Sequence, residues 1–248
     1  MIEIRRSEPG EYPVLLEERT ISGLHDFLNP ILKRYAIPGG RAIDLGAGSG
    51  ALAVRLRDLG YETIAVDLNR ERYKADIPLI QLNLNNPDFA PLGNGTFDFV
   101  TAVEVIEHLE SPITFLRHVR SLCKPGGIAL ITTPNMDNLP SRFRFLLTGK
   151  LHMMDEKVPN HISPTFYDLF IRQYLPRAGL KLVEHHLFPK NGYRVSRKSY
   201  SWAFRLIARF LPGNTLLGDV HIFVLKPIDD MQGTVRDATS IDLRPGIR

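Results

Sequence analysis

The chain has 248 residues, of which 44% are apolar, and its 31 Lys and Arg against 27 Asp and Glu give a formal net charge of +4. A chain of this length can hold one well-buried α/β domain with extra segments, and its composition is typical of a soluble globular protein. So weak a charge says little about acidic partners. No run of about 18 apolar residues is present, so no membrane-spanning helix is expected, and the charged stretch from Met1 to Gly10 is unlike a secretory signal. The single cysteine, Cys123, excludes an internal disulfide and fits a reducing cytosol. We expect it to be a buried structural thiol.

In chain order, residues from about Leu15 to Tyr35 predict one or two amphipathic helices that end at Pro38-Gly39-Gly40. Strand-like and helix-like segments then alternate, which indicates a parallel sheet covered by helices. The predicted strands are Arg41–Leu45, Glu62–Val66, Leu79–Leu82, Phe97–Ala102, Gly127–Thr132, Leu180–His186 and Val220–Lys226. The predicted helices are Ala51–Leu59, Pro112–Cys123 and Pro164–Ala178, the last two after Ser-Pro pairs that supply an N-cap and a first helical residue.

The most informative stretch runs from Ala42 to Gly50, where a short apolar strand ends at Asp44 and three alternating glycines follow. Glycines there allow a sharp turn and a close backbone approach to a ligand, at the positive end of the next helix. Gly46, Gly48 and Ala51 also fit the dinucleotide fingerprint, so a nicotinamide or flavin nucleotide remains an alternative. Asp44 argues against a pyrophosphate and favours a ligand with an ammonium group, such as S-adenosylmethionine.

Two further sites follow the next strands. Asp67 comes about twenty residues after the glycine turn, where an acid can accept hydrogen bonds from both ribose hydroxyls of an adenosine, although it could also be a strand-end turn carboxylate. Leu68 would pack on the adenine. Asn83 could accept from the adenine amino group while the Leu84 amide donates to the ring, or Asn83 could simply form a turn. The predicted cofactor set is Asp44, Gly46, Ala47, Gly48, Gly50, Asp67, Leu68, Asn83, Leu84 and Glu104.

With these residues in view, roughly residues 38 to 226 resemble the class I S-adenosylmethionine-dependent methyltransferases. The resemblance implies a Rossmann-like α/β fold with a seven-stranded, mostly parallel sheet, its last strand antiparallel, and the cofactor over the carboxyl ends of the first strands. Asn83 departs from the aspartate that many relatives carry. The motifs are Asp44-Leu-Gly-Ala-Gly-Ser-Gly50, Val66-Asp67, Phe97-Asp98-Phe99-Val100, Glu104-Val-Ile-Glu107-His108-Leu109 and Lys124-Pro-Gly-Gly127.

Glu104, Glu107 and His108 follow the fourth predicted strand, at the edge where open α/β sheets bind ligands. If a helix begins there, positions i, i+3 and i+4 share a face. His108 would then be the general base, with a glutamate such as Glu107 setting its tautomer, or the three would hold a divalent cation that acidifies a substrate hydroxyl. A third hypothesis is a purely structural role, in which these residues cap a helix and the histidine is a hydrogen-bonded part of the fold.

The same motif resembles the ubiquinone-biosynthesis O-methyltransferases and the small-RNA 3′-terminal 2′-O-methyltransferases. The RNA enzymes bind magnesium through two glutamates and two histidines. Residue by residue, this resemblance implies a metal set of Glu104, Glu107, His108 and His161, holding Mg²⁺ or another divalent cation.

We expect an N-terminal helical segment at 1–37, the S-adenosylmethionine-binding methyltransferase domain at 38–226 and a poorly ordered tail at 227–248. Two segments, 135–163 and 188–219, lie outside the cofactor core and should shape the substrate site. In the second, residues 197–211 predict a basic amphipathic helix, with Trp202, Leu206 and Phe210 at four-residue spacing beside Arg205 and Arg209. It could rest on an anionic bilayer, which would add peripheral membrane contact to a cytoplasmic location, but we favour a lid with its apolar side on the core.

Both segments resemble bacterial methyltransferases of cell-surface polysaccharide and glycolipid synthesis. The expected function is therefore methyl transfer to an oxygen of a small-molecule, sugar or lipid-linked acceptor. RNA is the competing acceptor, although recognised nucleic-acid modules are absent and only Arg142-Phe143-Arg144-Phe145 hints at it. A cofactor-binding partner protein without turnover is the third alternative. The oligomeric state cannot be inferred from the sequence.

Overall fold

A computed structural model describes residues 2–4, 14–86, 88–156, 158–194, 201–211, 213 and 215–228. Apart from Ile228, the tail predicted to be poorly ordered beyond Pro227 lies outside these residues, as do residues 197–200 of the predicted lid. None of the described helices is long and apolar enough to cross a bilayer.

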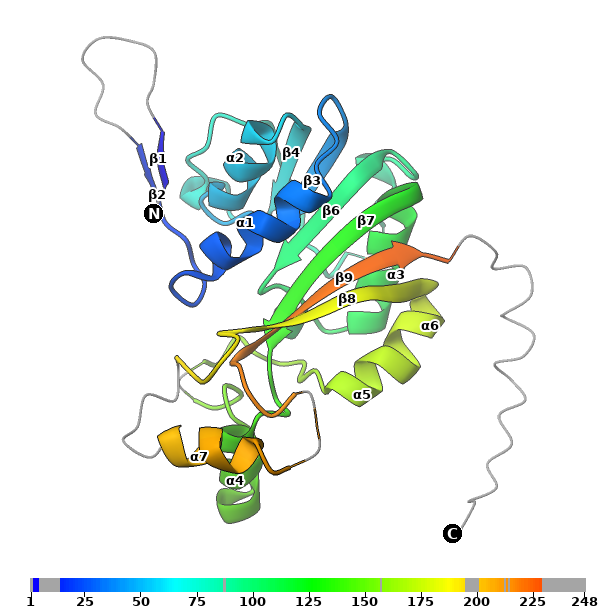
Figure 1. Ribbon diagram of the computed structural model, residues 1–248. Helices are drawn as coiled ribbons and strands as arrows, with labels where there is room; N and C mark the ends of the chain where they lie inside the picture. The colour runs from blue at the N-terminus through cyan, green and yellow to red at the C-terminus, as the bar shows by residue number, and fades with distance from the viewer. Residues whose placement is uncertain are drawn as a thin grey trace, which may run out of the picture.

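A seven-stranded sheet forms the centre of the molecule, in the order β5-β4-β3-β6-β7-β9-β8 (Figure 1). All its pairings are parallel except those of β9, which lies antiparallel between β7 and β8. The predicted sheet, with its antiparallel last strand, is therefore confirmed. The strands are β3 (Arg41–Leu45), β4 (Glu62–Asp67), β5 (Leu79–Gln81), β6 (Phe97–Val103), β7 (Cys123–Pro134), β8 (Leu180–Phe188) and β9 (Val220–Pro227).

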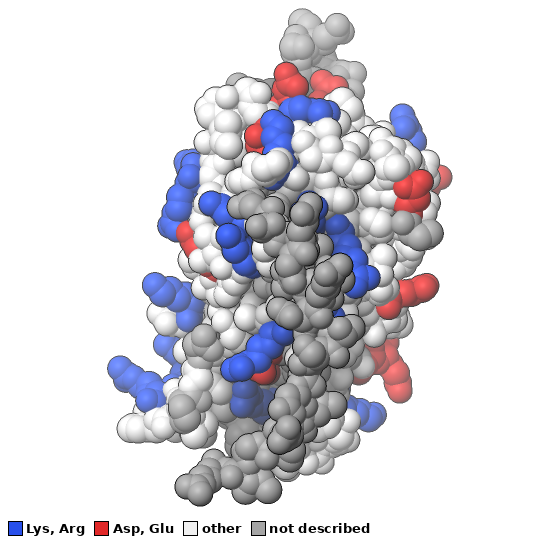
Figure 2. Space-filling view, turned by 90° about the vertical axis from the view of Figure 1, so that its right-hand side faces the viewer, with Lys and Arg blue, Asp and Glu red and all other residues white. Residues whose placement is uncertain are grey.

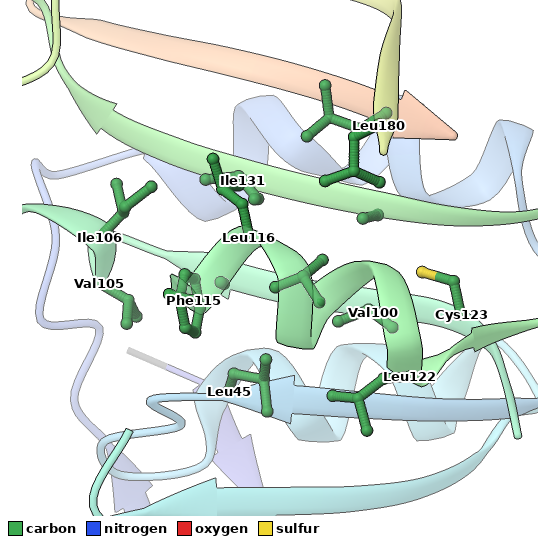
Figure 3. Close-up of a cluster of buried hydrophobic side chains, with 14 of the residues drawn as sticks. Leu45, Val100, Val105, Ile106, Phe115, Leu116, Leu122, Cys123, Ile131 and Leu180 are labelled. Atoms are coloured by element: carbon green, nitrogen blue, oxygen red, sulfur yellow. The ribbon is translucent and has the colours of Figure 1, made fainter. Parts of the chain in front are cut away.

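Helices cover both faces of this sheet. On one face α1 and α2 pack their leucines on β3, β6, β7 and β9, and on the other α3, α5 and α6 close a second apolar cluster (Figures 1 and 3). Because the central strands are buried on both faces, they read as almost continuous apolar runs, which made them easy to predict. The helices are α1 (Leu24–Arg34), α2 (Ala51–Asp58), α3 (Pro112–Leu122), α4 (Leu139–Thr148), α5 (Tyr167–Leu169), α6 (Leu175–Ala178) and α7 (Ser201–Ala208).

Cys123 begins β7 rather than ending a helix, and it is buried in the cluster shown in Figure 3. Burial raises the pKa of its thiol to about 12. The thiol is therefore protonated at neutral pH, as the prediction of a buried structural cysteine requires.

The N-terminal prediction is partly wrong. The chain from Leu15 does not begin a helix: β2 (Val14–Leu16) pairs antiparallel with β1 (Ile2–Ile4), and α1 begins only at Leu24. The start is displaced because Gly23, at φ 82°, turns the chain into the helix through the left-handed region that glycine adopts readily.

The helix predicted from Pro164 begins at Tyr167 and continues through α5, a π-helical turn (Phe170–Tyr174) and α6. Ser163 is not its N-cap. Its amide donates to the Glu107 carbonyl at 3.0 Å and its hydroxyl donates to the Leu109 carbonyl. The first helical amide, that of Tyr167, instead donates to Asp137 Oδ2 at 2.6 Å, so the cap comes from a distant segment.

The expected burial of the apolar side of α7 on the core is wrong. Trp202 is 66% exposed and Phe210, just after the helix, is 81% exposed, while Phe204 packs on Phe143 of α4 with ring centroids 5.1 Å apart. α7 thus rests on α4 below the carboxyl edge of the sheet, where β7 leaves it (Figure 1).

Candidate functional site

One pocket of about 760 Å³ lies at the carboxyl ends of β3, β4, β5 and β6. Open parallel sheets bind ligands at this edge, where the strand order reverses. Most of the predicted site residues line it, but Gly50 and Glu107 do not. The predicted residues that line the pocket are Asp44, Gly46, Ala47, Gly48, Asp67, Leu68, Asn83, Leu84, Glu104, His108 and His161.

Residues 46–50, here called the glycine loop, turn the chain from β3 into α2. Gly46, Gly48 and Gly50 all have positive φ, but the lack of a side chain has a different consequence at each position. A Cβ on Gly46 would lie 2.5 Å from Val105 Cγ2, and one on Gly50 would lie 2.4 Å from Ala75 Cβ, so these two glycines allow packing. A Cβ on Gly48 would meet only Arg19 Cδ, at 4.0 Å. Gly48 is therefore the glycine that opens backbone to a ligand.

Asp44 ends β3 as a buried carboxylate at the pocket floor. Its Oδ1 accepts a hydrogen bond from Thr101 Oγ1 at 2.7 Å, while Oδ2 has no partner of ordinary geometry among the described residues. Burial, with a smaller contribution from the charge of Asp67, raises its pKa to about 7. A buried, half-satisfied carboxylate fits the cationic ligand predicted for this position.

Asp67 ends β4 and braces the glycine loop. Its Oδ2 accepts from the Gly48 amide at 2.8 Å and its Oδ1 accepts from the Asn69 amide at 2.8 Å. Each carboxylate oxygen can accept a second hydrogen bond, so the brace leaves capacity for ribose hydroxyls. The turn role and the predicted ligand role of Asp67 are compatible.

The pocket wall next to Asp67 carries Leu68, which is 60% exposed, and the segment after β5. Asn83 Oδ1 accepts from the Asn85 amide at 3.0 Å, which is the turn-forming alternative that the sequence left open. The same oxygen keeps a lone pair for an adenine amino group.

The predicted helical face of Glu104, Glu107 and His108 is wrong. Glu104 lies in the left-handed region at φ 55°, and only a short 3-10 turn, Ile106–His108, follows. Thr132 holds this bend, because its Oγ1 accepts from the Glu104 amide and donates to Glu104 Oε1, both at 2.9 Å. Burial raises the pKa of Glu104 to about 7. Positive φ at a non-glycine residue is costly and is typical of functional sites.

Glu107 is fully buried behind the pocket. Neither of its carboxyl oxygens has a hydrogen-bond partner of ordinary geometry among the described residues. Burial, and then the charge of Glu104, raise its pKa well above the usual value. Its backbone carbonyl accepts from the amides of Ile162 and Ser163 at 2.8 and 3.0 Å, which fixes the loop that carries His161.

His108 and His161 face each other at the pocket, with ring centroids 4.8 Å apart. Each directs Nδ1 at a backbone carbonyl, His108 at Asn160 (2.9 Å) and His161 at Met153 (2.8 Å), so each Nδ1 carries the proton and each Nε2 can accept. The carbonyl of Asn160, rather than the glutamate we predicted, therefore sets the tautomer of His108. Burial and the neighbouring His108 lower the pKa of His161.

The Glu-His cluster, defined as Glu107, His108 and His161, offers one ligand-type atom from each residue within 4.8 Å of the others. Glu104, the fourth member of the predicted metal set, is not part of this group and is engaged by Thr132.

Sequence reasoning missed the wall formed by the segment before α1, including Arg19 and Thr20. This segment is held by Arg55 of α2, which donates to Glu18 Oε1 at 2.6 Å, and by Ser49 Oγ, which donates to the Glu17 carbonyl at 2.7 Å. No local pattern reveals it, because the partners lie more than 30 residues apart in the chain.

The Arg142–Phe145 stretch, which hinted at RNA, lies on α4. Arg142 is 3.8 Å from Asp137 and Arg144 is 2.6 Å from Asp155. Both guanidinium groups therefore have acidic partners within the chain.

A parallel sheet with one antiparallel strand, a glycine loop between β3 and α2, and acids at the ends of β3 and β4 together define a nucleoside-binding α/β fold of the methyltransferase type. A family model described as a methyltransferase domain matches residues 16–185. The chain belongs to the class I S-adenosylmethionine-dependent methyltransferase family.

Among curated proteins, the chain is similar to ubiquinone biosynthesis O-methyltransferases. It is 32% identical to that of Xanthomonas campestris pv. campestris (strain B100) over 130 residues, which cover 49% of this chain and 54% of the relative. It is 29% identical to that of Xanthomonas euvesicatoria pv. vesicatoria (strain 85-10) over 172 residues, or 63% of this chain and 71% of the relative. The chain thus spans about half the length of the first of these relatives.

Solved structures share the fold at low identity. A SAM-dependent methyltransferase from Archaeoglobus fulgidus has a TM-score of 0.58 and 18% identity, over 83% of this chain and 96% of that one. The 1,6-didemethyltoxoflavin-N1-methyltransferase of Burkholderia thailandensis, solved with S-adenosylhomocysteine, has a TM-score of 0.54 and 15% identity, over 83% and 78%.

Proposed function

We propose that this chain transfers the methyl group of S-adenosylmethionine to an oxygen atom of a small, sugar or lipid-linked acceptor. The observation that carries the proposal is one pocket with an adenosine-type cradle at one end and imidazole and carboxyl groups at the other. The names of the ubiquinone-biosynthesis relatives favour oxygen as the acceptor atom.

At the cradle end, Gly48 brings bare backbone to the cofactor, Asp67 accepts from the ribose, and Leu68, Asn83 and Leu84 surround the adenine. Asp44 faces the ammonium of the methionyl group. Arg19 lies next to Gly48, on the wall formed by the segment before α1, and faces the carboxylate of the methionyl group. Opposite charges then meet at both polar ends of the amino acid.

At the other end, the acceptor hydroxyl must lie in line with the methyl group and lose a proton as it is methylated. S-adenosylmethionine supplies an electrophilic methyl group on a positive sulfur. His108 takes the hydroxyl proton on Nε2, since its Nδ1 proton is held by the Asn160 carbonyl. Glu107 lies beside His108, and its carboxyl group, in its ionised form, stabilises the imidazolium. Glu104 forms the bend that joins the two ends of the pocket.

The wall around His108 supports a particular class of acceptor. Ile162 is half exposed, and Leu109 lines the same wall beside polar Asn160 and Glu110. An acceptor with both an apolar part and hydroxyl groups fits this mixture, which favours a lipid-linked sugar over a free one.

The test is transfer of labelled methyl groups from S-adenosylmethionine to matched acceptors: a simple phenol, free sugars and lipid-linked sugars. We expect label on oxygen, identified by mass spectrometry, and preference for the lipid-linked acceptor. Equal rates with free and lipid-linked sugars would refute the lipid-linked acceptor, and failure to bind S-adenosylhomocysteine would refute the whole proposal.

A second role for the Glu-His cluster, binding a divalent cation, is favoured by one specific observation. Both histidines donate Nδ1–H to backbone carbonyls and leave Nε2 available, and the Glu107 oxygens beside them are unsatisfied. Outer hydrogen bonds of this kind are common behind metal-ligating histidines. In that case Glu107, His108 and His161 would hold the ion, which would acidify the acceptor hydroxyl.

Titration with Mn²⁺ and activity in excess chelator separate the two roles of His108. Saturable Mn²⁺ binding that H161A removes, with activity lost on chelation and restored by Mg²⁺ or Mn²⁺, would assign a cation site. Unchanged turnover in chelator would leave His108 as the base and refute the cation.

A further inference from the structure

The lower end of the molecule carries an apolar surface that the proposed reaction does not use. Nine of the fourteen exposed large apolar side chains in the described part of the chain lie on α4, on α7 and just after α7, with Leu146 and Phe210 about four-fifths exposed. We call these nine the α4–α7 face: Phe143, Phe145, Leu146, Leu147, Trp202, Leu206, Ile207, Phe210 and Leu211.

This face is held in place by the fold. Asn135 and Asn138, both buried, donate side-chain hydrogen bonds to the carbonyls of Thr215, Leu217 and Gly218, which join the start of α4 to the chain between α7 and β9. Phe143 and Phe204 lock the two helices together. The remaining apolar side chains are therefore exposed on a surface that the fold holds in one arrangement. An apolar surface of this kind usually marks an interaction site.

The charges that the face itself carries are basic. The described residues within 138–154 and 185–218 include seven Lys and Arg and no Asp or Glu. The two acids that border α4, Asp137 and Asp155, are paired with Arg142 and Arg144. Arg205, Arg209 and Lys150 are exposed. The lower end of the molecule in Figure 2, at the height of α4 and α7 in Figure 1, shows Lys and Arg side chains beside uncharged ones.

We propose that the α4–α7 face docks on an anionic phospholipid bilayer. Trp202, Phe210 and the α4 leucines enter the boundary between headgroups and acyl chains, while Arg205 and Arg209 contact lipid phosphates. Long basic stems beside apolar side chains suit this boundary, because the stem lies in apolar surroundings and the charge stays at the headgroups. The exposed basic side chains beside the face favour a negatively charged surface over a neutral one.

Docking would also place the pocket near the lipid. Arg144 of α4 pairs with Asp155 at 2.6 Å, and two residues before Asp155 the carbonyl of Met153 holds His161 at the pocket. The segment between α4 and α5 thus joins the face to the Glu-His cluster. This consequence for a lipid-linked acceptor rests on the proposed function, whereas docking itself does not.

Vesicle binding tests the proposal without any turnover. The full chain is sedimented with vesicles of phosphatidylcholine alone and of phosphatidylcholine mixed with phosphatidylglycerol, and we expect binding to the mixed vesicles that weakens with salt. R205Q/R209Q should bind about 30-fold more weakly, since each basic residue at an anionic surface contributes a factor of about five. W202S/F210S should lose on the order of 100-fold.

The matched control is R172Q/R177Q, which removes the same charge from exposed positions of the helix around α5 and α6. It should bind like the unmodified chain, and all variants should keep the same affinity for S-adenosylhomocysteine as a check of folding. Three results would overturn the proposal. The first is no binding to mixed vesicles at low salt, and the second is an equal loss of vesicle binding in R172Q/R177Q. The third is self-association that W202S/F210S abolishes in a chain that does not bind vesicles. The last would assign the face to a second copy of the chain.

Discussion

At the glycine-loop end of the pocket, the groups that would meet a ligand come from the ends of β3, β4 and β5, the turns after them and the segment before α1. At the other end, His108 and Asn160, which orients it, are 52 residues apart in the chain. At the first end Asp67 braces the backbone of the glycine loop, and at the second a loop docked on the Glu107 carbonyl brings the side chains together. This difference indicates that cofactor binding and acceptor chemistry can be damaged separately.

The sharpest test of that separation is H108A. Loss of a general base costs on the order of 10³-fold in kcat. His161 also has an available Nε2, but burial and the neighbouring His108 lower its pKa, which makes it a poor substitute base. The Kd for S-adenosylhomocysteine, measured by calorimetry, should not change. H186A, a histidine paired with Glu184 on β8, is the control and should leave kcat intact. An unchanged kcat in H108A would remove His108 from the mechanism.

The reverse experiment is D67A. Both Asp67 oxygens accept hydrogen bonds from backbone amides, so the variant loses the brace of the glycine loop together with the proposed ribose contact. The affinity for S-adenosylhomocysteine should fall about 100-fold, as expected for two or three hydrogen bonds to a charged group. D58A, an exposed acid on α2, is the matched control. Full affinity in D67A would show that the comparison between the two ends is wrong.

How well the sequence predicted each region follows the same division. Apolar runs and glycines at fixed spacing encode several features locally: the seven strands, the carboxyl edge of the sheet, the glycine loop and Asp67. The structure has these features where the patterns predict them. The bend at Glu104 could not be predicted, because it depends on Thr132 from a neighbouring strand. The start of α5 depends on Asp137, and the wall at Arg19 depends on Arg55. The exposure of α7 follows from packing on α4, which no periodicity within α7 could reveal.

A smaller effect should appear in the pH dependence of binding. Asp44 has a pKa of about 7 without ligand and must be ionised to face an ammonium, so binding releases protons. The affinity for S-adenosylhomocysteine should rise about tenfold from pH 6 to pH 8, with proton release seen by calorimetry in buffers of different ionisation enthalpy. D44N should remove this dependence and E104Q should retain it. A dependence that E104Q removes and D44N keeps would assign the titration to the acceptor end instead.

The smallest expected effect is a gain in stability at the acceptor end. Glu107 has its pKa raised by burial, so the folded protein binds its proton more tightly than the unfolded chain does, and stability declines as the pH rises above the unfolded pKa of about 4.5. E107Q removes that penalty and should raise the free energy of unfolding of the ligand-free protein by about 1 kcal/mol, or ~2–4 °C in Tm, more at pH 8 than at pH 5. E71Q, at an exposed position, should change neither value. A gain in stability of E107Q together with reduced turnover would mean that the buried carboxyl group serves the reaction at the expense of stability. A loss of stability would mean instead that the carboxyl group is structural and that its proton already has a hydrogen-bond partner.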